Sequence, residues 1–254
     1  MSKDSSIEWT ESTWNPVTGC TKISDGCKNC YAERMAKRLS AMGHPNYKYG
    51  FTVSCHEHVL DLPLNWRKPK MVFANSMSDL FHKNVNLSFI KKVFLTMNKA
   101  RWHCFQVLTK RSNRMVKLSK KLNWTSNIWM GVTVESYHYK NRILDLQETP
   151  ANVKFLSLEP LIGPISKIPL EGIDWVIVGG ESGPGAREMK KEWATDVRDQ
   201  CVAAEVPFFF KQWGGVNKKR AGRLLDNRLW DQMPIIDMMV AESDSQLVGS
   251  NLEK

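Results

Sequence analysis

The chain has 254 residues, of which 42% are hydrophobic and 24% charged. This composition can bury the core of one large α/β domain or two small ones, and it excludes a disordered or collagen-like chain. Lys and Arg number 36 against 26 Asp and Glu, and the net charge of +10 favours an acidic partner such as nucleic acid, although a solvated basic surface gives the same balance.

Short apolar runs alternate with helical patterns along the chain. Residues 71–74, 104–108, 128–134, 153–158, 175–178 and 207–210 are predicted strands, and helical patterns include those opening at residue 30, spanning 87–97 and spanning 193–201. Alternation of this kind implies parallel strands with right-handed crossovers. We therefore expect an α/β fold, a complete or partial TIM-type (β/α) barrel over residues 1–236, with an open doubly wound sheet as the alternative. Residues 237–254 lose periodicity and are expected to form a flexible tail.

The sequence contains neither a membrane-spanning stretch nor a signal peptide. No apolar stretch approaches the roughly 18 residues needed to span a bilayer, and residues 1–6 lack the apolar core of a signal peptide. We therefore expect a cytoplasmic protein without a membrane partner.

Polar side chains follow the predicted strands, at the point where each strand ends. In a parallel barrel these ends meet at one mouth, where substrates bind, although strand ends also tend to be polar simply because they lie near solvent. Glu159 and Glu181 are the most informative, because each follows directly on an apolar run. The candidate mouth residues are Ser76, Ser78, Asp79, Lys110, Thr133, Glu135, Glu159 and Glu181.

Three cysteines stand close together in the loop 19–31. Cys20, Cys27 and Cys30 have the spacing C-x6-C-x2-C, and three thiolates on one short loop can hold a metal centre. Two interpretations remain open: an iron–sulfur cluster with one iron open to a small molecule, or a structural zinc ion with a fourth ligand from the nearby segment. Candidates for that fourth ligand are Cys55, His56 and His58, whereas Cys104 and Cys201 are predicted core residues.

A set of motifs gives the chain a resemblance to a known family over residues 7–234. The motifs are Trp14-Asn15-Pro16, Cys30-Tyr31-Ala32, Asn75-Ser76-Met77-Ser78-Asp79, Leu108-Thr109-Lys110, Gly131-Val132-Thr133, Ser157-Leu158-Glu159-Pro160, Gly179-Gly180-Glu181-Ser182-Gly183 and Phe210-Lys211-Gln212-Trp213-Gly214. With them the chain resembles the radical S-adenosylmethionine (SAM)-like proteins of phages and bacteria, long known only as phage proteins of unknown function and distantly similar to DNA repair enzymes of the spore photoproduct lyase type.

The resemblance implies a cofactor pair and a reaction. Cys20, Cys27 and Cys30 would ligate a [4Fe–4S] cluster that binds SAM, and one electron from a donor such as flavodoxin or ferredoxin would cleave SAM to a 5′-deoxyadenosyl radical. Lys110 would hold the SAM carboxylate, and Tyr31 would stack on or shield the adenine. The SAM ammonium would be received by Ser76, Ser78 or Asp79, ribose or substrate would face Thr133, Glu135 and Glu159, and Glu181 is also included among the cofactor-binding candidates.

The expected substrate is nucleic acid, with DNA favoured over RNA, undergoing lesion repair or base modification. A helix beginning near the mouth would carry a strand across it, because its basic side chains recur at helical spacing. Two alternatives stay open: a non-enzymatic, zinc- or cluster-stabilised nucleic-acid-binding protein, and a radical SAM enzyme acting on a peptide or small molecule. The basic stripe consists of Lys110, Arg114, Lys117 and Lys121.

Overall fold

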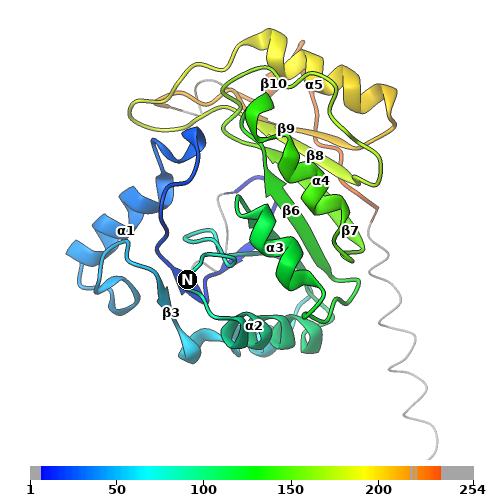
Figure 1. The fold of residues 1–254 in the computed structure, drawn as a ribbon. Coiled ribbons are helices and arrows are strands. Elements are labelled where there is room, and N and C mark those ends of the chain that lie inside the picture. The colour runs from blue at the N-terminus through cyan, green and yellow to red at the C-terminus, as the bar shows by residue number, and fades with distance from the viewer. Residues whose placement is uncertain (1–6, 218–219, 221, 236–254) are drawn as a thin grey trace, which may run out of the picture.

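A seven-stranded parallel sheet, curled into a half-barrel, forms the centre of the molecule (Figure 1). The computed structural model describes residues 7–217, 220 and 222–235. The order of the strands in the sheet is their order in the chain, as a partial TIM-type barrel requires. The strands are β1 (Ser12–Trp14), β4 (Met71–Ala74), β5 (Cys104–Thr109), β6 (Ile128–Thr133), β7 (Val153–Leu158), β8 (Trp175–Gly179) and β9 (Phe208–Gln212).

Helices surround this sheet in Figure 1. They are α1 (Tyr31–Ala41), α2 (Leu87–Lys99), α3 (Ser112–Ser119), α4 (Asn141–Gln147) and α5 (Lys191–Ala203). Two small antiparallel pairs complete the strands: β2 (Val17–Thr18) with β3 (Ser54–Cys55), and β10 (Leu224–Leu225) with β11 (Arg228–Leu229). Short 3-10 turns lie at Asp25–Cys27, Pro45–Tyr47, Glu57–Val59, Leu62–Asn65 and Tyr137–Tyr139.

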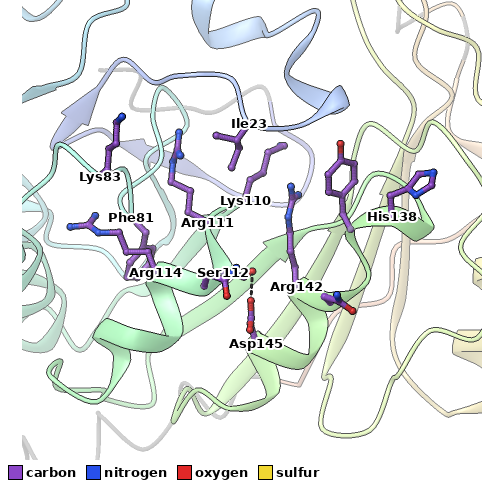
Figure 2. A pocket seen from close by; sticks show the side chains of 13 residues that line it. Ile23, Phe81, Lys83, Lys110, Arg111, Ser112, Arg114, His138, Arg142 and Asp145 are labelled. Atoms are coloured by element: carbon purple, nitrogen blue, oxygen red, sulfur yellow. Dashed lines mark hydrogen bonds between the residues drawn. The ribbon is translucent and has the colours of Figure 1, made fainter.

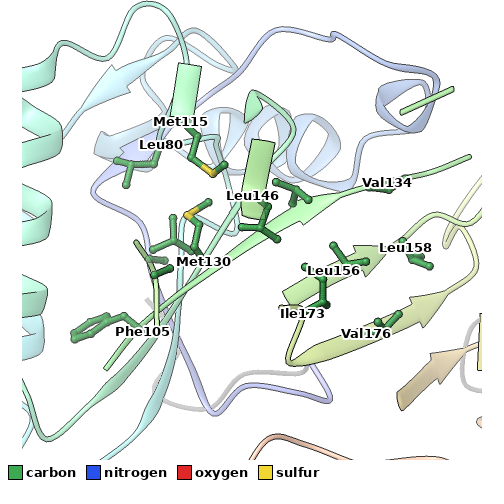
Figure 3. Packing of buried hydrophobic residues seen from close by; sticks show 14 of the residues in the cluster. Leu80, Phe105, Met115, Met130, Val134, Leu146, Leu156, Leu158, Ile173 and Val176 are labelled. Atoms are coloured by element: carbon green, nitrogen blue, oxygen red, sulfur yellow. The ribbon is translucent and has the colours of Figure 1, made fainter. Parts of the chain in front are cut away.

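The two faces of the sheet bury different side chains. Along each strand, alternate residues point to opposite faces, so one set packs under the helices and the other points into the half-barrel. The helix-covered set includes Phe105, Met130 and Leu156, which lie together with Met115 and Leu146 of α3 and α4 (Figure 3). The inward set is an aromatic cluster at the base of the half-barrel, formed chiefly by Trp9, Phe73, Trp129, Phe155, Trp175 and Phe209.

The predicted α/β fold with a partial parallel barrel is confirmed, and so is the position of every predicted strand, to within two residues at either end. The alternation of apolar runs and helical patterns did not predict β1 or α4, which are only three and seven residues long. The helix that carries the basic stripe is shorter than the spacing indicated. It spans Ser112–Ser119, so Lys110 and Lys121 lie outside it and the stripe of four is not continuous on one helix.

Two other expectations concern the ends of the chain and its membrane contacts. The predicted tail, residues 237–254, lies outside the described residues. Within the described part of the chain, no helix has both the length and the apolar character that crossing a bilayer demands.

Candidate functional site

The interior of the half-barrel contains a cavity of about 910 Å³. Its apolar part is lined by Trp9, Phe73 and Leu108, which belong to or adjoin the aromatic cluster at the base. Its polar part lies at the carboxyl ends of the strands, and Tyr31, Met35 and Leu39 of α1 form a further wall. Polar wall residues include Asn15, Ser76, Lys110, Thr133, Ser157, Glu159, Lys211 and Gln212.

An ion pair spans two strand ends in this cavity. Lys211 Nζ of β9 donates to both carboxylate oxygens of Glu159, at 2.7 and 3.0 Å, and Gln212 Nε2 approaches Glu159 Oε1 at 3.3 Å. Gly179 lies beside the pair, and a Cβ there would be 3.3 Å from the Glu159 carboxyl carbon. A ligand in the cavity would thus meet the Lys211–Glu159 ion pair and, beside it, the backbone of Gly179, which no side chain covers.

Lys211 and Gln212 were not among the predicted site residues, although a signal for them exists. They follow the apolar run at 208–210, just as the predicted residues follow their own strands. Of the predicted cofactor-binding residues, the structure brings together around the cavity Tyr31, Ser76, Lys110, Thr133 and Glu159.

Four other predicted residues are engaged elsewhere in the protein. Ser78 Oγ donates to the carbonyl of Gly19, at 2.6 Å. Asp79 accepts from Thr109 Oγ1 at 2.7 Å and from the backbone N–H of Lys110 at 3.2 Å, which fixes the turn after β5. Neither side chain lines the large cavity.

Glu135, the third of these, anchors the cysteine loop, which we define as residues 19–31. Its side chain follows β6 and is fully buried. Oε1 accepts from Ser24 Oγ of the loop at 2.5 Å, and Oε2 accepts from Arg142 Nη1 of α4 at 2.8 Å. Gly26 packs so closely against this carboxyl that a Cβ would lie 2.5 Å from Oε1. Glu135, which the sequence predicted to face ribose or substrate, is therefore hydrogen-bonded to the cysteine loop.

Glu181, the fourth, anchors the same loop from the end of β8. Its Oε2 accepts from Asn29 Nδ2 at 2.9 Å, and its carboxylate pairs with Arg187, whose Nη2 lies 2.6 Å from Oε1. Arg187 Nη2 also donates to the carbonyl of Asp25 at 2.9 Å. Burial alone would raise the pKa of Glu181, but the hydrogen bonds from Arg187 and Asn29 outweigh it and lower the pKa to about 2. The anchor is therefore ionised at neutral pH.

The three loop thiols are free and partly exposed. Arg111 Nη2 lies 3.7 Å from Cys20 Sγ, whose pKa is raised by burial and by Asp79. Burial also acts to raise the pKa of Cys27, but Lys110 and nearby hydrogen bonds lower it overall. At Cys27 the cationic neighbour thus favours thiolate, the form that binds metals, whereas at Cys20 burial and Asp79 outweigh Arg111.

As a donor set, three part-exposed thiols beside two cations fit an iron–sulfur cluster in their chemistry. Their positions are not those of a formed site: within the described residues, no three His, Cys, Asp or Glu side chains are gathered as a metal-binding group. Nor do the candidate fourth ligands of the alternative zinc site support it. Cys55 is exposed, and His56 is occupied by a hydrogen bond of 2.8 Å between its Nε2 and Thr18 Oγ1.

The remaining two cysteines are core residues, as predicted. Cys104 and Cys201 are both buried, and burial raises the pKa of Cys201 to about 12. Both therefore remain thiols at neutral pH, packed as small apolar groups.

Comparison with known proteins gives a family and one distant structure. No curated protein matches the chain. The solved structure "Spore photoproduct lyase complexed with dinucleoside spore photoproduct" is 11% identical, with a TM-score of 0.43, over 92% of this chain and 71% of that one. A family model described as "Protein of unknown function (DUF5131)" matches residues 4–234, and the chain therefore belongs to that family.

Proposed function

We propose that the protein is a radical SAM enzyme that acts on nucleic acid, with residues 1–236 as a single catalytic domain. The observation that supports this most is the placement of the three thiols. They lie on a loop that two ionic anchors, Glu135 and Glu181, attach to the carboxyl ends of parallel strands, the edge where a partial barrel binds its ligands. The cavity of about 910 Å³ opens among those same strand ends.

In this proposal Cys20, Cys27 and Cys30 hold a [4Fe–4S] cluster. When bound, such a cluster supplies the electron that cleaves SAM to methionine and a 5′-deoxyadenosyl radical, and flavodoxin or ferredoxin is the class of donor that would reduce it. Arg111 and Lys110, which already lie beside Cys20 and Cys27, compensate part of the negative charge of the thiolates.

The cavity residues bind and orient SAM and substrate. Lys110 pairs with the SAM carboxylate, and Ser76 offers a hydroxyl oxygen to the ammonium group. Thr133 and the Glu159–Lys211 pair bind hydroxyl groups of the ribose or of the substrate. Tyr31, on the first turn of α1, is more than half exposed and supplies a flat face for the adenine.

The substrate assignment rests on size and charge. A volume of about 910 Å³ is near the upper end of what small-molecule sites usually provide, roughly 300–1,000 Å³, and so leaves room for SAM and a nucleoside. The net charge of +10 attracts a polyanion. DNA undergoing lesion repair or base modification is the substrate class that we propose.

The test is an anaerobic reconstitution with iron and sulfide, followed by dithionite and SAM and by analysis for 5′-deoxyadenosine. We expect wild type to bind iron and form 5′-deoxyadenosine, and Cys27→Ala to lose both. Cys201→Ala is the matched control, because its thiol lies on the buried face of α5 and outside the cysteine loop. A wild-type protein that holds zinc and forms no 5′-deoxyadenosine would refute the proposal.

A further inference from the structure

A second cavity, of about 450 Å³, lies between the cysteine loop and the first turns of α3 and α4. Figure 2 shows the side chains of Lys110, Arg111 and Arg142 directed toward the loop segment that carries Ile23. We call this cavity the basic pocket, and its positively charged lining residues are Lys83, Lys110, Arg111, Arg114 and Arg142.

The charges of the basic pocket are only partly neutralised by the protein. Asp145 is the carboxylate in its lining, and it accepts a hydrogen bond of 2.5 Å from Ser112 Oγ. Arg142 is paired with Glu135, which also lies 3.8 Å from Lys110 Nζ, and Arg111 Nε lies 3.7 Å from Asp79. Arg114, in contrast, donates only to the backbone carbonyls of His82 and Val85, and it forms no ion pair with any described residue.

Lys83 and the start of α3 add to this excess of positive charge. The Lys83 side chain is exposed at the rim and, within the described residues, makes no ion pair. No side chain caps the N-terminus of α3, whose first-turn residues Ser112, Asn113 and Arg114 line the pocket. Arginine forks, a lysine and an uncapped helix start together suit a phosphate oxygen better than a neutral ligand.

The position of the basic pocket relates it to the large cavity. Lys110 lines both, so the two cavities share a wall at the end of β5. We propose that the basic pocket binds a phosphate group of a nucleic-acid strand, next to the cavity that receives the nucleoside to be modified. This inference rests on the proposed function for its choice of nucleic acid, whereas a free phosphate or nucleotide is the other source of the same chemistry.

The test compares two charge reversals on exposed lysines. Lys83→Glu places a carboxylate at the rim of the basic pocket, and Lys91→Glu makes the same charge change on α2, outside the residues that line it. Binding of a fluorescent single-stranded DNA is measured over a series of salt concentrations. We expect Lys83→Glu to weaken binding about tenfold or more and to reduce the slope of log affinity against log salt by about 1, and Lys91→Glu to change little.

A second variant and a second ligand make the result specific. Asn113→Glu, also exposed on the first turn of α3, should weaken DNA binding in the same way without removing a cation. Calorimetry with inorganic phosphate alone distinguishes the sources. Loss of phosphate binding in Lys83→Glu with unchanged DNA binding would overturn the assignment to nucleic acid, and equal effects of Lys83→Glu and Lys91→Glu would overturn the pocket itself.

Failure here is separable from failure of the proposed function. Formation of 5′-deoxyadenosine without added DNA reports on the cysteine loop and SAM, and we expect it to be unchanged in Lys83→Glu. Wild type that forms 5′-deoxyadenosine but shows no effect of Lys83→Glu on DNA binding overturns only the phosphate site. A protein with the expected DNA effect but no 5′-deoxyadenosine overturns only the radical chemistry.

Discussion

Replacing Glu135 by Gln tests whether a buried carboxylate holds the cysteine loop in place. The substitution keeps the size of the side chain and removes its charge. The amide cannot accept from both Ser24 and Arg142 as the carboxylate does, at 2.5 and 2.8 Å. The guanidinium of Arg142 would then remain in a nearly buried position without its anion.

The expected loss of stability follows from these contacts. Removing one member of a buried ion pair costs about 3–5 kcal/mol. Arg142 keeps its hydrogen bond to the carbonyl of Thr133, at 2.7 Å, so we expect the lower end, about 3 kcal/mol. For a chain of this size such a loss lowers the melting temperature by roughly 6–12 °C.

Thermal unfolding measures this, together with the iron content after anaerobic reconstitution. Glu57→Gln is the matched control, because Glu57 forms an ion pair of 2.8 Å with Lys92 in which both side chains are more than half exposed. Such exposed pairs contribute about 0–1 kcal/mol. If Glu135→Gln unfolds at the temperature of Glu57→Gln and retains wild-type iron content, the anchoring role of Glu135 is wrong.

Three further predictions concern other parts of the site. Because the folded pKa of Glu181 is lowered from 4.5 to about 2, its ionic stabilisation is present above pH 4.5 and is lost as the pH falls toward 2. The free energy of unfolding should therefore fall more steeply with pH in this window for wild type than for Glu181→Gln. Equal slopes for the two proteins would contradict the anchoring role of Glu181. Gly180→Ala places a Cβ 1.9 Å from the carbonyl oxygen of Trp213 and should destabilise the chain by about 1–3 kcal/mol or more, measured by urea unfolding. Gly163→Ala, whose added Cβ meets only Ser136 Cβ, at 3.2 Å, separates this clash from the loss of glycine itself. Lys211→Met leaves the Glu159 carboxylate without its cation, so SAM binding measured by calorimetry should weaken by about tenfold; unchanged affinity would remove the pair from the site.

The sequence was sufficient for the sheet because its strands are buried on both faces. The run 175–178 is apolar throughout, the run 153–158 is apolar except for Lys154 and Ser157, and both lengths match strands between two layers. The short β1 carries too little pattern to be recognised, since three residues of mixed polarity resemble any loop. The start of α3 was misplaced because Lys110 continues the helical spacing, whereas its backbone N–H is held in a turn by Asp79.

The site was harder to predict, because spacing does not show which polar group faces a cavity and which faces the protein. Glu135, Glu159 and Glu181 all follow apolar strands, so the sequence pattern around them does not distinguish their roles. In the structure, Glu159 lines the cavity, whereas the other two bind the cysteine loop. This difference depends on contacts between residues more than a hundred positions apart, which no local pattern contains.

Those long separations have a consequence for biosynthesis. The loop meets its anchors across 111 residues for Ser24 and Glu135, 152 for Asn29 and Glu181, and 162 for Asp25 and Arg187. The ribosome completes the thiols long before it adds the last of these partners, and at about 5–20 residues per second the interval is roughly 8–30 s. During that time the nascent chain carries three unanchored thiols, exposed to oxidation or to the wrong metal. Under the proposed function, cluster loading would therefore follow the folding of the C-terminal half of the sheet.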